Sequence, residues 1–171
     1  MKIGIIILIV VICIFQGLKA KNSDNILAVG QVAPNFTLIS ENQKKVSLKD
    51  YKGKQVVIYF FPKAETPGWT KEACGFRNVY EEYKKANIMV FGISYDSPKS
   101  LLTFKEKFNL PFTFLSDSDK KVSKLFGADG IFFPKRITFL VGPDGIVKKI
   151  YDKINVNTHA NEILNDITKK N

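Results

Sequence analysis

The sequence predicts an α/β protein whose mixed sheet is covered by helices. Residues 55–61 and 88–94 form two continuous apolar runs rich in β-branched and aromatic side chains, a pattern typical of strands buried on both faces. Helical periodicity follows each run, and strands that alternate with helices pair in parallel through crossover connections. The 171 residues suit one domain with a substantial core.

The first half of the chain predicts a hairpin, two buried strands and a helix between those strands. Residues 35–40 and 45–48 alternate around a short polar turn and predict an N-terminal hairpin. The strand over 55–61 follows, and a loop with two prolines then leads to a predicted helix over 70–86. The second buried strand covers 88–94.

The second half of the chain continues the alternation of helices and strands and supplies the last strands of the sheet. Ser97-Pro98, a capping residue followed by a first-turn proline, opens a helix that runs to about Asn109. A strand over 111–115 and a short helix from about Asp119 come next. The remaining elements are a hairpin over 136–141 and 146–151, turned by Gly-Pro-Asp-Gly, and an amphipathic helix over 158–168. A thioredoxin-type α/β sandwich satisfies this order.

The N-terminus has the pattern of a targeting segment. Lys2 precedes an apolar run over 3–15, which is too short for a comfortable membrane span and has the length of a signal-peptide core. We therefore predict residues 1–20 as a signal peptide or retained anchor, 21–30 as a linker and 31–171 as the domain. The expected location is extracytoplasmic: periplasmic, or in a secretory compartment, and membrane-anchored if the segment stays attached.

Basic residues exceed acidic ones, 26 against 16, for a net charge of +10. The lysines are dispersed and no aromatic platform is interleaved with them, so a solvated basic surface is favoured over nucleic-acid binding. Cys13 lies in the targeting segment, which leaves Cys74 as the domain's single thiol. An intrachain disulfide is then excluded, and the domain is a monomer or a dimer linked through Cys74.

Residues 62–77, PKAETPGWTKEACGFR, carry the most specific motif. Further motifs lie at 92–98, 110–117 and 136–145. Together they resemble the peroxiredoxin family, in particular its Q-type (bacterioferritin comigratory) branch, over about residues 30–165. The resemblance implies a thioredoxin-like fold of peroxiredoxin type with a central mixed sheet, and thiol-dependent reduction of hydrogen peroxide and organic hydroperoxides with electrons from a thioredoxin-like partner.

The same resemblance assigns the candidate catalytic residues. Pro62 and Thr66 match the active-site loop, Arg136 matches the arginine that completes the site, and Cys74 matches the resolving cysteine. Trp69 stands at the position of the peroxidatic cysteine. Indole has one N–H donor and no nucleophile, so it cannot attack a peroxide.

Three interpretations of Trp69 stay open. It fills the pocket mouth as a core aromatic, it binds a ligand by stacking, or it stands for a selenocysteine encoded by UGA and translated as tryptophan. The function is accordingly a peroxiredoxin-like antioxidant activity, a selenocysteine peroxidase, or a non-catalytic binding or structural role.

Helical spacing gives expectations for Cys74 and its helix. Positions 69 and 74 are about 140° apart on a helix, so Cys74 is predicted to face away from the pocket, near solvent. Three interpretations of this thiol stay open: a bystander, an interchain disulfide, or a slow reductant. The predicted apolar stripe comprises Trp69, Ala73, Phe76, Tyr80 and Tyr83. His159 is predicted to be an exposed residue at the start of the last helix, and with so few ligands we expect no metal and no cofactor.

Overall fold

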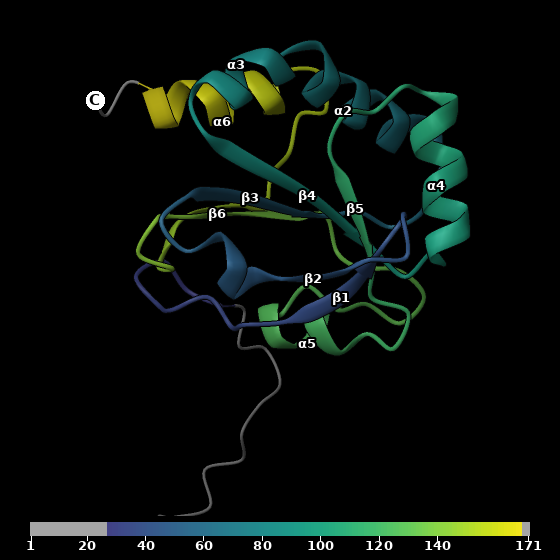
Figure 1. The fold of residues 1–171 in the computed structure, drawn as a ribbon, viewed down its shortest axis with the longest axis horizontal. Coiled ribbons are helices and arrows are strands. Elements are labelled where there is room, and N and C mark those ends of the chain that lie inside the picture. Colours follow the sequence, from purple (N-terminus) through teal and green to yellow (C-terminus); the bar gives the residue numbers. More distant parts are fainter. Residues whose placement is uncertain (1–26, 169–171) are drawn as a thin grey trace, which may run out of the picture.

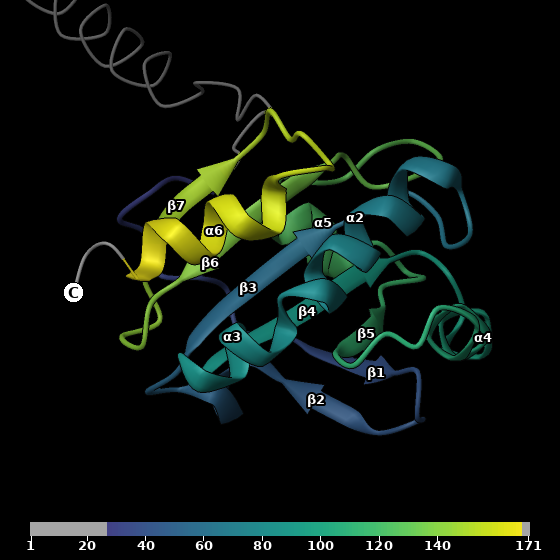
Figure 2. The same ribbon diagram turned by 90° about the horizontal axis from the view of Figure 1, so that it is seen from above.

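The computed structural model describes residues 27–168 and places one mixed sheet between two layers (Figures 1 and 2). Seven strands pair in the order β2-β1-β5-β4-β3-β6-β7. Their bounds are β1 Thr37–Ser40, β2 Lys45–Ser47, β3 Gln55–Phe60, β4 Ile88–Ser94, β5 Thr113–Ser116, β6 Ile137–Val141 and β7 Val147–Tyr151. The predicted thioredoxin-like α/β fold with an N-terminal hairpin is confirmed.

The centre of the sheet is parallel, as the strand–helix alternation predicts. β3 pairs in parallel with β4, and β4 pairs in parallel with β5. The flanking strands β6 and β1 join antiparallel, so the sheet is mixed. Parallel β3 and β4 end at the same edge of the sheet, which is where the segment following Phe60 begins.

Helices cover both faces of the sheet unequally. Four helices, α2 Pro67–Asn78, α3 Tyr80–Lys85, α4 Pro98–Lys107 and α6 His159–Thr168, lie on one side, and α5 Lys121–Phe126 lies on the other (Figure 1). A short 3₁₀ helix, η1 Leu48–Tyr51, follows β2 and is absent from the sequence prediction. Ser97 caps α4 as predicted, since its side chain accepts a hydrogen bond from the Ser100 N–H.

Alternate side chains of β3 pack into two hydrophobic cores, one on each face of the sheet. Val57 and Tyr59 point into the cluster under α2, α3, α4 and α6, whereas Ile58 and Phe60 point into the cluster under α5. All four are at most 2% exposed. This strand is therefore buried on both faces, which explains why its sequence is continuously apolar rather than alternating.

The predicted helix over 70–86 is wrong as a single element. It begins earlier, at Pro67 behind Thr66, and Val79 divides it into α2 and α3 with φ −116° and ψ 17°. Asn78 and Val79 are both weak helix formers, and they fall at the interruption. The apolar stripe is nevertheless confirmed, because Ala73, Phe76 and Tyr83 are buried and Trp69 and Tyr80 pack against the same cluster.

Replacing Phe76 by alanine is expected to cost about 3–5 kcal/mol of unfolding free energy. The Phe76 side chain is fully buried, and its ring lies 5.0 Å from that of Tyr59 and 5.8 Å from that of Tyr83. Urea unfolding of the domain measures the loss. The control is Phe132→Ala, where the side chain is 78% exposed and the change should stay within about 0.5 kcal/mol. Equal costs at the two positions would contradict this packing.

Within residues 27–168 no helix has both the length and the apolar composition needed to cross a membrane. The predicted targeting segment over 1–20 lies outside the described residues, and so does Cys13.

Candidate functional site

The segment between β3 and α2 is tied to the end of β4. Asp96, which follows β4, accepts two hydrogen bonds on Oδ2: one from the Ala64 N–H at 2.9 Å and one from the Ser94 hydroxyl at 2.9 Å. Pro62 is half-buried at the start of this segment. The loop that carries Pro62 and Thr66 is therefore held at the carboxyl edge of the parallel strands.

Thr66 stands at the N-cap of α2 with extended backbone angles. Its carbonyl accepts from the Trp69 N–H at 3.1 Å and from the Thr70 N–H at 3.0 Å, and its hydroxyl donates to the Lys63 carbonyl at 3.1 Å. Position 69 thus lies in the first turn of a 12-residue helix. The dipole of such a helix favours negative charge at its first turn.

Arg136 lies directly against residue 69. The guanidinium carbon is 3.4 Å from the centroid of the Trp69 ring, which is a stacked cation–π contact. A side chain on Gly68 would place its Cβ 3.3 Å from the Arg136 Nη2, so the guanidinium extends along the first turn of α2. The structure therefore brings the two residues together although 67 positions separate them in the sequence.

A buried polar cluster lies behind this contact. Glu72 is 2% exposed, one turn after Trp69, and neither carboxyl oxygen has a hydrogen-bond partner. The Arg136 Nε lies 4.0 Å from Glu72 Oε2, and the His159 Nε2 lies 3.8 Å from Glu72 Oε1. The same His159 nitrogen is hydrogen-bonded to the Thr138 hydroxyl at 2.9 Å.

The predicted exposure of His159 is wrong, because this residue is 1% exposed. Its ring packs edge-on against Phe76, with centroids 5.9 Å apart, and against Tyr151 at 5.2 Å. The first turn of α6 faces α2, so a histidine there enters the core instead of solvent. Neither Glu72 nor His159 is among the site residues that sequence reasoning selected.

Burial sets the protonation states of this cluster. It raises the pKa of Glu72 to about 7, while the charge of Arg136 opposes the shift. It lowers the pKa of His159 to about 4, with Arg136 and Lys149 adding to the effect. Burial also lowers the pKa of Arg136 below its ordinary value, and Glu72 counteracts this. The folded protein therefore holds a neutral imidazole and, below pH 7, a neutral carboxylic acid beneath one guanidinium.

Cys74 is half-buried, so the thiol is partly accessible to solvent and partly covered by protein. Burial raises the pKa of Tyr59 well above its usual range, and Glu72 and then Cys74 add to the shift. The segment before α6 covers this part of α2, since a Cβ on Gly75 would lie 3.7 Å from the Val156 carbonyl oxygen.

An intact α2 keeps positions 69 and 74 apart. Five residues of helix rise about 7.5 Å, whereas the Cα atoms of a disulfide are usually about 4.4–6.8 Å apart. In a Trp69→Cys variant, oxidation to the 69–74 disulfide is therefore expected to unwind the first turns of α2. Circular dichroism at 222 nm should lose helical signal on adding peroxide, and the Trp69→Cys, Cys74→Ser double variant should keep it. An unchanged spectrum with the disulfide present would contradict this geometry.

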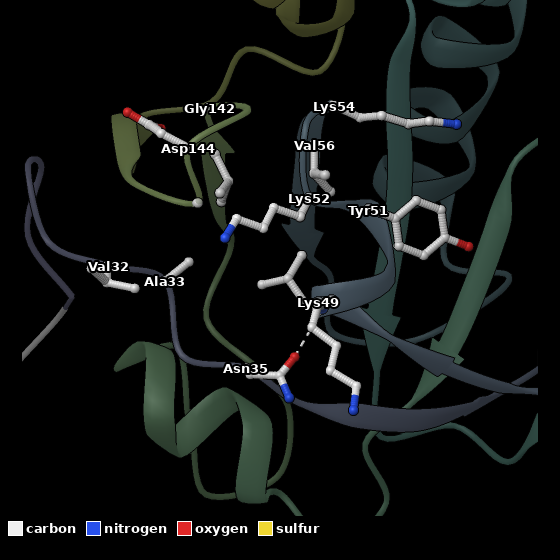
Figure 3. A pocket seen from close by; sticks show the side chains of 13 residues that line it. Val32, Ala33, Asn35, Lys49, Tyr51, Lys52, Lys54, Val56, Gly142 and Asp144 are labelled. Atoms are coloured by element: carbon white, nitrogen blue, oxygen red, sulfur yellow. Dashed lines mark hydrogen bonds between the residues drawn. The ribbon is translucent and has the colours of Figure 1, made fainter.

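A cavity of about 220 Å³ lies at the opposite end of β3, away from position 69 (Figure 3). Apolar Leu48, Val56 and Val141 line it, and the Lys52 side chain extends across it. None of the five predicted site residues lines this cavity. Among residues 27–168, no three histidine, cysteine or acidic side chains converge in a way that could hold a metal ion.

Comparison with known proteins agrees with the fold and the motif. The AhpC/TSA family matches residues 29–150, and the chain belongs to this peroxiredoxin family. Its branch is that of the Bcp and Q-type members. "Peroxiredoxin Bcp" of Escherichia coli K12 is 41% identical over 152 residues, covering 82% of this chain and 96% of the relative. "Peroxiredoxin Q, chloroplastic" of Triticum aestivum is 49% identical over 126 residues, covering 72% and 58%.

A solved structure of the same branch has the same architecture. The Xylella fastidiosa PrxQ C47S mutant superimposes with a TM-score of 0.80 at 29% identity, over 84% of this chain and 96% of that one.

Proposed function

We propose that the N-terminus of α2 is a peroxide-reduction site of peroxiredoxin type, with residue 69 at the peroxidatic position. The contact that carries the proposal is the Arg136 guanidinium, 3.4 Å from the residue 69 side chain in the first turn of α2. A cation and a helix N-terminus converge on one side chain, and together they favour an anionic nucleophile there. The expected substrates are hydrogen peroxide and organic hydroperoxides.

The reaction proposed for the site is a two-electron reduction. A thiolate or selenolate at position 69 attacks one peroxide oxygen, the O–O bond breaks, and the other oxygen leaves and takes up a proton as water or alcohol. The attacking atom becomes a sulfenic or selenenic acid. The Cys74 thiol condenses with it, releases water and forms a bond between the two chalcogens, which a thioredoxin-like dithiol then reduces.

Tryptophan at position 69 supplies no attacking atom for this sequence of steps. The chain with Trp69 is therefore proposed to be a non-catalytic peroxiredoxin-like protein with a binding or structural role. One observation favours this second function: the indole packs on the Arg136 guanidinium at the first turn of α2, where the attacking thiolate of a peroxiredoxin site would lie.

Selenocysteine at position 69 remains a hypothesis that would restore catalysis in the native protein. Its test is the codon, because UGG at this position excludes selenocysteine and UGA supports it.

Peroxide consumption by the purified Trp69 protein, with thioredoxin as reductant, tests the proposal directly. We expect no turnover above the uncatalysed rate, both for this protein and for its Cys74→Ser variant. Turnover that the Cys74→Ser change abolishes would overturn the assignment of residue 69, because Cys74 would then be the working thiol.

We also propose that residues 1–20 direct export. The apolar run over 3–15 behind Lys2 supports this. Expression with the native N-terminus, followed by fractionation and intact mass measurement, should recover the protein outside the cytoplasm, either shortened near Ala20 or retained in the membrane. Full-length protein in the cytosolic fraction would contradict export.

A further inference from the structure

The loop between α5 and β6 presents consecutive bulky apolar side chains to solvent. Ile131 is 82% exposed, Phe132 78% and Phe133 48%, and Leu125 on α5 is 53% exposed. We call Ile131, Phe132 and Phe133 the apolar tip. Single exposed apolar residues are ordinary, but a contiguous group usually marks an interaction surface.

The base of this loop is hydrogen-bonded, so the apolar tip has a defined position. Lys120 donates from Nζ to the Ile131 carbonyl at 2.7 Å, and the Lys135 N–H donates to the Ala128 carbonyl at 2.8 Å. Gly130 permits the tight turn, because a Cβ there would lie 2.1 Å from the Phe133 carbonyl oxygen. One side-chain and one backbone hydrogen bond thus fix the base of the loop, while its three apolar side chains stay exposed.

Basic side chains surround the apolar tip. Lys121 and Lys124 are exposed on α5, and Lys135 is exposed beside Phe133. Lys120 lies at the base of the loop. The nearby acids outside the core are Asp119, which pairs with Lys121 at 2.7 Å, and the half-buried Asp129. Positive charge therefore predominates around an apolar centre, which is the arrangement that anionic lipid surfaces attract.

The described chain begins on the same side of the molecule, beside α5 (Figure 1). The Leu27 N–H donates to the Phe126 carbonyl at 3.3 Å, next to Leu125. The apolar run over 3–15 is separated from Leu27 by the 11 residues 16–26, which span at most about 40 Å when fully extended. A bilayer that holds the N-terminal run is within reach of this side of the domain.

We propose that the apolar tip and its lysines form a peripheral contact with an anionic lipid surface. Ile131 and Phe132 insert among the headgroups, and Lys121, Lys124 and Lys135 neutralise lipid phosphates. This contact requires no chemistry at position 69. A second copy of the chain is a poorer partner for the surface, because the net charge of +10 opposes self-association.

The test places a fluorescent probe at the apolar tip of the full chain. Ile131→Cys is labelled with the environment-sensitive dye NBD in a Cys13→Ser, Cys74→Ser background. Vesicles contain phosphatidylcholine alone or phosphatidylcholine and phosphatidylglycerol in equal parts. The matched control carries the label at Glu81→Cys on α3, where the side chain is 71% exposed on the opposite face of the sheet.

With phosphatidylglycerol vesicles, the label at position 131 should shift to shorter wavelength and become accessible to lipid-borne quenchers, while the label at position 81 stays in water. Adding Phe132→Ser and Phe133→Ser should abolish the shift, and Lys121→Glu with Lys124→Glu should reduce it. A label at 131 that stays in water with these vesicles overturns the proposal. A shift that appears without vesicles and grows with protein concentration also overturns it, because it identifies a second copy as the partner.

Discussion

Replacing Trp69 by cysteine is expected to raise the rate of peroxide consumption at least ~10³-fold, because the change supplies a covalent nucleophilic step that the Trp69 protein lacks. The remaining parts of the site are in place. Thr66 stands at the N-cap position of α2 and Arg136 lies along its first turn, so a thiol at position 69 would sit at a helix N-terminus beside a cation. Both features lower a thiol pKa and increase its thiolate fraction at neutral pH.

Three variants separate nucleophilic catalysis from other causes of the gain. Trp69→Ser frees the same space without a thiol and should remain inactive. Trp69→Cys with Arg136→Met should lose most of the gain, because the cation is removed. Trp69→Cys with Cys74→Ser should complete one turnover and then stall with thioredoxin as the reductant. If Trp69→Cys is no faster than the Trp69 protein, the surrounding residues do not form a working peroxide site.

Replacing Glu72 by glutamine is expected to stabilise the folded domain by about 3 kcal/mol at pH 8 and to have little effect at pH 4. The pKa of Glu72 rises from 4.5 to about 7 on folding, so the folded state binds the proton more tightly. The stability that this group contributes is present below pH 4.5 and is lost as the pH rises through 7. Glutamine has the shape of glutamic acid but does not ionise, so the variant does not lose this stability at high pH.

His159 makes the stability of the folded domain depend on pH in the opposite direction. Its pKa falls from 6.5 to about 4 on folding, so its contribution is present above pH 6.5 and is lost as the pH falls through 4. In the parent protein the two slopes oppose each other between about pH 4.5 and 6.5. Glu72→Gln should therefore leave a protein that becomes steadily less stable toward acid below pH 6.5 and is insensitive to pH between 7 and 9.

Urea unfolding at pH 4, 6 and 8 measures both effects. Glu162→Gln is the matched control, because this carboxylate is 45% exposed and lies 4.0 Å from the His159 Nδ1; its change should stay within about 0.5 kcal/mol. If Glu72→Gln is less stable than the parent at pH 8, the pairing of the ionised Glu72 with Arg136 outweighs its burial, and folding does not raise the pKa of Glu72.

The sheet and most helices could be predicted from the sequence because their signals are local. The apolar runs of β3 and β4, the Ser97-Pro98 start of α4 and the turn before β7 each depend on a few neighbouring residues. The loop motif around Thr66 likewise identified the family. Position 69 and Arg136 were paired through the family resemblance, and the structure shows them in contact.

The buried cluster could not be predicted because its members meet only in three dimensions. His159 has the same sequence context, the start of an amphipathic helix, whether that helix turn faces solvent or α2. Glu72 lies three residues after Trp69 and four before Phe76, so helical spacing places it beside the apolar stripe, but a search for apolar residues passes over a carboxylate. The partial burial of Cys74 has a related cause, because a helical wheel with one apolar stripe omits the second covering element, the segment before α6.

The stacked pair at position 69 also has a practical consequence for spectroscopy. Trp69 is the only tryptophan in the chain, and its indole is half-buried under the Arg136 guanidinium. The intrinsic emission excited at the red edge of the protein's absorbance therefore originates from one place, the candidate site itself. Any anion that draws Arg136 away, or any small molecule that inserts between the indole and the guanidinium, should alter the emission without a label. The residue that removes the expected chemistry therefore also provides an intrinsic optical reporter for ligand screening.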